Sequence, residues 1–184
     1  NFSNFSYGAD YFFIKANKST KPKFKNTLVT IGGSDPNSIT ASLAKILGDD
    51  ASYMIGPAFD RRHRDKIRRI VKSENIIEGS TETFKHIAKA NLVISAIGTT
   101  LQEIEMLKKN CILVSNYTTD EDHFNSILRC SKNPKNYIFH GHFRQLNKSK
   151  LKREMLSFDT LEINEHFNVK KHNKEAKAKW LHIL

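Results

Sequence analysis

Residues 92–114 read LVISAIGTTLQEIEMLKKNCILV, and this stretch decides the fold class. The apolar run at 92–96 predicts a buried strand, which stops at Gly98. Apolar residues then recur at helical spacing and predict a helix over 100–109. A second apolar run at 111–114 predicts the next strand. A strand, an amphipathic helix and another strand in this order are typical of a parallel sheet covered by helices.

The same unit repeats on both sides of this stretch. Further strands are predicted at 28–31, 52–55, 75–78 and 137–139, and further helices at 35–47, 62–72, 81–90 and 120–130. Asp35 and Pro36 should begin the first helix, as a capping carboxylate followed by proline at the first helical position. With right-handed crossovers, the pattern predicts a doubly wound, mostly parallel, Rossmann-like α/β sheet of about six strands with helices on both faces.

The 184 residues are enough for one α/β domain and too few for two. We expect residues 1–25 to be a linker from a missing N-terminal domain, because they are Lys-rich, aromatic and irregular. Residues 26–145 should form the Rossmann-like domain that carries the binding site, and residues 146–184 its C-terminal helical extension. No signal pattern and no run of about 20 apolar residues occurs, so we expect a cytoplasmic protein.

The chain is strongly basic. Lys and Arg number 30 against 19 Asp and Glu, a formal net charge of +11. The cations concentrate over 15–25, 61–72 and 170–179, without the interleaved aromatic residues that stack on single-stranded nucleic acid. We therefore expect an anionic small ligand or peripheral contact with an anionic membrane surface, and no specific nucleic acid.

Other chemistries find little support. The two cysteines, Cys111 and Cys130, are too few for a disulfide scaffold and are expected to be reduced thiols. His140 and His142 lack a third ligand in register, so no metal site is predicted. The G-x-G-x-x-G and G-x-x-x-x-G-K-[ST] motifs are absent, which argues against nicotinamide and ATP chemistry. No cofactor is expected.

Two turns at strand ends can bind an anion. Gly32, Gly33 and Ser34 follow the first strand; the glycines allow close backbone approach, Ser34 adds a hydroxyl, and the next helix should present free N–H groups. The alternative is an ordinary tight turn between strand and helix.

The second turn follows the fourth strand. Gly98, Thr99 and Thr100 place N–H groups and hydroxyls at a helix start, which suits a diphosphate. Glu103 lies one turn further, where a carboxylate can accept both hydroxyls of a ribose. The alternative is a Thr-x-x-Glu capping box between Thr100 and Glu103.

Together, LVTIGGSDPN, YMIGPAF and ANLVISAIGTTLQEIEMLKKNCILV resemble the C-terminal half of GT-B type UDP-sugar enzymes. The resemblance covers residues 7–114. It is strongest to the UDP-sugar hydrolases of pseudaminic acid biosynthesis and the related spore-coat polysaccharide proteins, and more distant to the lipid II-forming N-acetylglucosaminyltransferase.

The resemblance implies UDP binding. It assigns Gly32, Gly33, Ser34, Gly98, Thr99 and Thr100 to the diphosphate, Glu103 to the ribose, and Gly79 and Ser80 to the uracil. The family's Asn-Gln pair after the fifth strand is absent, and Asn116 or His123 would face the sugar instead. In GT-B enzymes the N-terminal domain supplies the catalytic base, so the catalytic residues are unknown.

The sequence therefore predicts the UDP-sugar-binding domain of an enzyme that hydrolyses or transfers the sugar, in bacterial surface-glycan or nonulosonic acid biosynthesis. The alternatives are a non-catalytic nucleotide-binding or interaction module with a degenerate site, and a basic nucleic-acid-binding domain.

Overall fold

The structure is a computed structural model that describes residues 27–80, 82–158, 174 and 177–178. Six strands form one sheet: β1 (Thr27–Thr30), β2 (Ser52–Ile55), β3 (Ile76–Glu78), β4 (Leu92–Ser95), β5 (Asn110–Ser115) and β6 (Tyr137–His142). Their order is β3-β2-β1-β4-β5-β6, and every neighbouring pair is parallel. The predicted Rossmann-like α/β class is confirmed.

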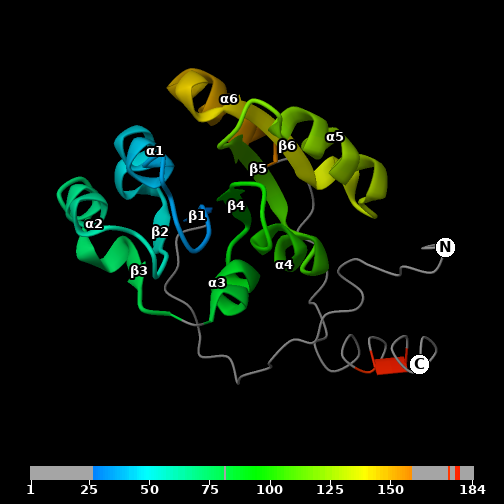
Figure 1. Cartoon of the computed structure of the whole chain (residues 1–184), viewed down its shortest axis with the longest axis horizontal. Coiled ribbons are helices and arrows are strands. Elements are labelled where there is room, and N and C mark those ends of the chain that lie inside the picture. Colours follow the sequence, from blue (N-terminus) through cyan, green and yellow to red (C-terminus); the bar gives the residue numbers. More distant parts are fainter. Residues whose placement is uncertain (1–26, 81, 159–173, 175–176, 179–184) are drawn as a thin grey trace.

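Helices cover both faces of the sheet (Figure 1). One layer consists of α1 (Ile39–Leu47), α2 (Arg61–Arg68) and α6 (Lys148–Ser157), and the other of α3 (Thr83–Lys89), α4 (Thr100–Met106) and α5 (Asp120–Cys130). Short 3-10 helices lie at Gly48–Asp50, Ser73–Asn75, Pro134–Asn136 and Phe143–Gln145.

The layers follow from the alternation of side chains along each strand. In β1, Val29 packs into the core under α1 and α2, whereas Leu28 packs into the core under α3 and α4. Adjacent residues of β5 divide in the same way, with Ile112 on the first side and Leu113 on the second. Both faces are apolar, which is why these strands appear in the sequence as continuous hydrophobic runs.

One predicted helix start is wrong. The helix α1 begins at Ile39 and not at Asp35. Asp35 still caps it, because its carboxylate accepts the N–H groups of Ile39 and Thr40 at 2.9 and 2.7 Å. The intervening residues form a turn that ends at Ser38, whose φ of +52° is left-handed and interrupts the helix.

The predicted linker over 1–25, and most of the predicted extension beyond 158, lie outside the described residues. Within the described part of that extension, Leu151 and Phe158 are buried in the core shared with α1 and α2. Cys111 is buried, Cys130 is exposed, and both are free thiols. The helices of the described residues include none that is long and apolar enough to cross a bilayer.

Candidate functional site

The candidate site lies where β1 and β4 run side by side in the centre of the sheet. Thr30 pairs with Ser95, so the loops that follow these strands leave the same edge together. The chain then turns to opposite faces, since α1 belongs to one layer and α4 to the other. In open parallel sheets, such a divergence at the carboxyl ends of strands is where ligands bind. The structure thus brings the two predicted turns together.

The loop after β2 holds the turn after β1 in place through close backbone contacts. Gly32 has a φ of +107°, which favours glycine, and the carbonyl of Gly33 accepts the N–H of Ala58 at 2.9 Å. A Cβ atom on Gly56 would lie 2.3 Å from the carbonyl oxygen of Gly32, so only glycine fits there. Ser34 is exposed, and its hydroxyl has no partner among the described residues.

The start of α1 differs from the prediction. Its first N–H groups were expected to be free for an anion, but Ile39 and Thr40 donate theirs to Asp35. Any anion at this turn must therefore be held by residues before the helix, such as Ser34. Asp35 itself is buried, and the two N–H groups compensate its charge.

A buried histidine, which the sequence analysis missed, lies beside Asp35. The His63 side chain is 3% exposed, and its Nε2 lies 3.6 Å from Asp35 Oδ2. Its ring stacks on Phe59 with a centroid distance of 4.7 Å. Burial lowers the pKa of His63, against the opposing effect of the Asp35 and Asp60 carboxylates. The signal was available, because His63 lies one helical turn before the buried Ile67.

The turn after β4 presents polar groups outward. Gly98 and Thr99 are exposed, and their carbonyls accept the N–H groups of Leu101 and Gln102 at 3.1 Å. These bonds tighten the first turn of α4. Within the described part of the chain, the hydroxyls of Thr99 and Thr100 have no hydrogen-bond partner. The turn can therefore donate to a ligand.

Glu103 lies one turn into α4 and is partly buried. Its carboxylate has no hydrogen bond or ion pair with any residue that the structure describes, and desolvation raises its pKa. The capping-box alternative is wrong. Thr99, and not Thr100, occupies the cap position, and its side chain makes no capping hydrogen bond. Within the described residues, the Glu103 carboxylate is therefore not used in a cap or an ion pair.

The predicted uracil site lies at the end of β3, separated from β1 by β2. Gly79 has a φ of +69° there. The Ser80 hydroxyl lies 3.0 Å from His86 Nε2 and accepts the N–H of Glu82 at 3.1 Å. Its oxygen is already used in local structure, so a base would meet the backbone here more readily than this hydroxyl.

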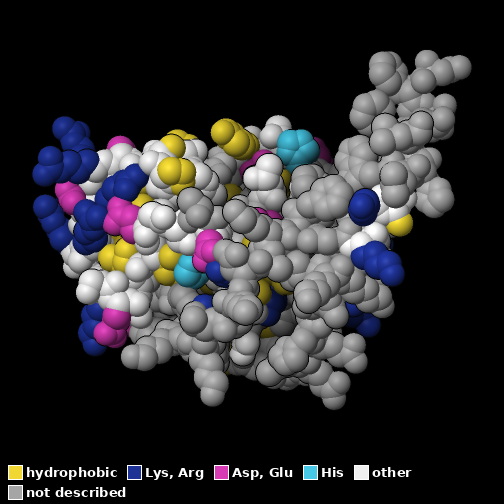
Figure 2. Space-filling model, turned by 90° about the horizontal axis from the view of Figure 1, so that it is seen from below, with side chains coloured by type: hydrophobic (Ala, Val, Ile, Leu, Met, Phe, Trp, Pro, Cys, Tyr) yellow, Lys and Arg dark blue, Asp and Glu magenta, His cyan; other side chains and the backbone are white. Residues whose placement is uncertain are grey.

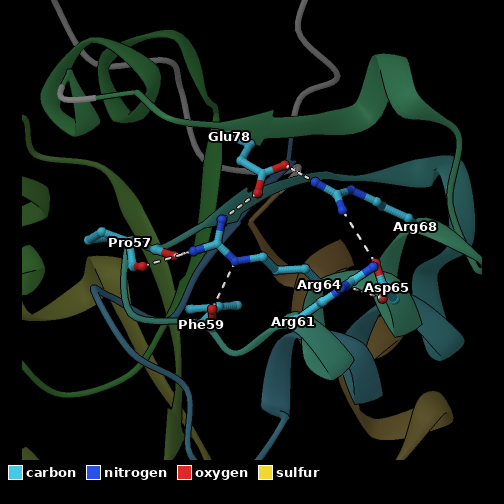
Figure 3. A network of polar contacts seen from close by, with 8 residues as sticks. Pro57, Phe59, Arg61, Arg64, Asp65, Arg68 and Glu78 are labelled. Carbon is cyan, nitrogen blue, oxygen red and sulfur yellow. Dashed lines mark hydrogen bonds and ion pairs between the residues drawn. The ribbon is translucent and has the colours of Figure 1, made fainter.

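An arginine fixes the neighbouring loop (Figure 3). Arg64 donates to the carbonyls of Pro57 and Phe59, each at 2.8 Å, and to Glu78 at 2.5 Å. Arg68 binds the second carboxylate oxygen of Glu78 at 2.5 Å. Burial raises the pKa of Glu78, but the hydrogen bonds from Arg68 and Arg64 outweigh it and lower the pKa. This network ties α2 and the loop after β2 to the end of β3.

The two residues predicted to face the sugar follow β5. Asn116 Oδ1 accepts a hydrogen bond from Asn37 Nδ2 at 3.1 Å, so it lies against the loop after β1. Its N–H donates to Asp120, as does that of Tyr117. His123 is exposed, with its Nδ1 3.7 Å from Asp120 Oδ1. The structure brings Asn116 to the loop after β1 and fixes the backbone around it.

The two histidines considered as metal ligands have different surroundings. His140 is buried, and its Nδ1 lies 2.5 Å from Glu154, which ties β6 to α6. His142 packs beside Phe143. No three His, Cys, Asp or Glu side chains gather as a metal site in the described ranges.

No protein-family model matches the chain, and no curated protein matches its sequence. Among solved structures, the glycotransferase of kitacinnamycin has a similar fold, with a TM-score of 0.56 and 11% identity. The match covers 91% of this chain and 44% of that chain, so this chain spans less than half of that protein's length. At this identity the likeness shows the fold alone: an α/β domain similar to a glycosyltransferase domain.

Proposed function

We propose that this chain is the UDP-sugar-binding half of a GT-B type enzyme that hydrolyses or transfers the sugar, in bacterial surface-glycan or nonulosonic acid biosynthesis. The observation that carries the proposal is the central edge of the sheet. There, two glycine-bearing turns diverge, and Ser34, Thr99, Thr100 and Glu103 have no partner among the described residues.

In this proposal the diphosphate lies between the two turns, and the Glu103 carboxylate accepts the two ribose hydroxyls. The uracil lies against the backbone at Gly79 and Ser80. The sugar extends toward Asn116 and His123 at the end of β5.

The two turns proposed to bind the diphosphate contain no cationic side chain. Neither 31–38 nor 96–103 contains a lysine or arginine. The diphosphate is therefore held by backbone N–H groups and hydroxyls, which are neutral donors. Because no ion pair with these segments is made, the affinity should depend only weakly on salt.

Calorimetric titration with UDP, UMP, CDP and GDP tests the proposal. We expect UDP to bind more tightly than UMP, because only a diphosphate spans both turns, and more tightly than CDP or GDP. Equal affinities for UMP and UDP would remove Gly98, Thr99 and Thr100 from the phosphate site. The absence of binding to any of the four would leave the fold without this function.

A further inference from the structure

The two helical layers carry opposite charge. Within their bounds, α1, α2 and α6 contain ten Lys or Arg and two Asp or Glu. By contrast, α3, α4 and α5 contain three Lys or Arg and five Asp or Glu. Figure 2 shows Lys and Arg side chains gathered at the end of the molecule where α2 lies in Figure 1. The positive charge of the described fold is therefore concentrated on one face of the sheet.

Helix α2 provides the first part of this charge. Arg62, Lys66 and Arg69 follow each other at spacings of four and three residues, which places them on one stripe. All three are exposed, and none lies within 4.0 Å of a carboxylate of the described residues. The adjacent stripe is compensated instead: Arg61 and Arg68 contact Asp65, Arg68 contacts Glu78, and Lys72 contacts Asp49.

Helix α6 of the same layer provides the second part. Lys148, Lys152 and Arg153 are exposed and have no carboxylate partner in the part of the chain described. Lys150, by contrast, donates to the carbonyl of His140 and lies 3.8 Å from a Glu154 carboxylate oxygen. Leu156 is 65% exposed and lies one turn after Lys152.

Within the described part of the chain these cations are unpaired, and this has an energetic cost. Like charges one helical turn apart repel each other, so an uncompensated stripe destabilises its helix slightly. Among the described residues, carboxylates compensate the neighbouring stripe of α2 but not this one. An anionic partner would remove the repulsion on both helices.

We propose that the basic face, formed by Arg62, Lys66, Arg69, Lys148, Lys152 and Arg153, docks on the surface of an anionic phospholipid bilayer. Each Lys or Arg close to such a surface strengthens binding about fivefold, so six of them give reversible peripheral binding. Leu156 is placed to enter the headgroup region beside the cations of α6.

The distribution of charge favours a bilayer over nucleic acid. A helix that lies in a nucleic-acid groove meets phosphates on both flanks. On one flank of α2 the arginines are already paired with Asp65 and Glu78, so this flank offers few free cations to one wall of the groove. Neither helix exposes an aromatic ring on which a base could stack. A planar anionic surface needs only one charged face.

Co-sedimentation of the chain with lipid vesicles tests the proposal. We expect binding to vesicles of phosphatidylcholine mixed with phosphatidylglycerol, and little binding to phosphatidylcholine alone. Raising sodium chloride from about 0.1 M to about 0.5 M should release the protein, because screening shortens to a few ångströms. This part of the test needs no variant.

The variant R62Q/K66Q/R69Q should weaken vesicle binding by on the order of 100-fold, from three fivefold losses. The control R129Q/K132Q/K135Q removes the same charge from exposed positions in and after α5, and should weaken binding much less. Circular dichroism checks that both variants stay folded. An equal loss in both variants would show that binding depends on the net charge of the chain and not on this face, and would overturn the proposal.

Two further results would overturn the proposal. One is equal binding to both kinds of vesicle, which would show that the protein does not recognise the negative charge of the lipid. The other is tighter binding to a DNA duplex or a single-stranded oligonucleotide than to anionic vesicles, at equal phosphate concentration and salt. Failure to bind UDP would leave this inference intact, because the basic face and the edge at β1 and β4 are separate.

Discussion

At the scale of single residues, Glu103 separates function from structure most cleanly. Glu103→Gln keeps the size of the side chain but removes the charge that strengthens hydrogen bonds to a ribose. Charge-assisted hydrogen bonds contribute about 1.5–3 kcal/mol, so UDP affinity should fall about tenfold or more. Because burial raises the pKa of Glu103 in the folded state, removing the charge should not lower the melting temperature.

The matched ligand is 2′-deoxy-UDP. It should bind the unmodified protein more weakly than UDP does. It should also lose less further affinity than UDP in the Glu103→Gln variant, because one of the two hydroxyls that would donate to the carboxylate is already gone. If the variant instead loses stability and keeps its UDP affinity, Glu103 has a structural role and the ribose assignment fails.

His63 gives the chain a pH-dependent stability. Its pKa is lowered in the folded state, so below about 6.5 the unfolded chain binds more protons than the folded one. The free energy of unfolding should therefore fall as the pH drops from 6.5, by up to about 1.4 kcal/mol per pH unit, until the folded-state pKa is reached.

Urea unfolding of the chain and of His63→Leu between about pH 7.5 and about pH 5 measures this dependence. The variant should show a shallower slope than the unmodified chain. An unchanged slope in His63→Leu would mean that His63 does not contribute to it.

At the scale of elements, Gly56 shows how the loops depend on each other. A methyl group at this position would press on the carbonyl oxygens of Gly32 and Gly33 at 2.3 and 2.4 Å. Backbone atoms cannot yield as a flexible side chain can. Gly56→Ala should therefore lower the free energy of unfolding by about 1–3 kcal/mol and weaken UDP binding.

Gly98→Ala is the matched substitution for folding stability. A Cβ atom there meets nothing within 4 Å, and the φ of Gly98 is not left-handed. Chemical denaturation of both variants should show a large loss for Gly56→Ala and a small change for Gly98→Ala. Similar losses in the two would mean that the close approach is relieved by backbone movement.

Elements were predictable from sequence where burial alone decides them. The strand β2 and the helix α5 have the predicted bounds, because apolar runs and helical periodicity define them. The start of α1 was not predictable in this way, because the Asp35 carboxylate accepts hydrogen bonds from N–H groups four and five residues further along the chain. The spacing of His63 to Ile67 indicated that His63 is buried, but the spacing does not show the neighbouring Asp35 and Phe59, which only the structure places beside it.

At the scale of the whole molecule, the sequence predicted the class of the sheet but not the order of its strands. The four inner strands β1, β2, β4 and β5 are all short, largely apolar and almost wholly buried, so composition does not reveal their order. The pairing of β1 with β4 is what brings the Gly32 and Gly98 turns together. The candidate residues of each turn were predictable from the sequence. That the two turns lie at neighbouring strand ends was seen only in the structure. The separation of charge between layers was equally hidden, because basic and acidic segments alternate along the chain.

The pairing of β1 with β4 also bears on how the chain folds. Thr30 pairs with Ser95, 65 positions further along the chain, so this is a slow, high-contact-order step compared with the formation of each local βα unit. During synthesis, β1, β2 and β3 emerge first, and the central edge of β1 remains open until β4 arrives. An open edge of this kind is vulnerable to pairing with another nascent chain. The candidate site forms only when β1 and β4 pair, so a ligand bound across both turns would stabilise that pairing and help to close the open edge.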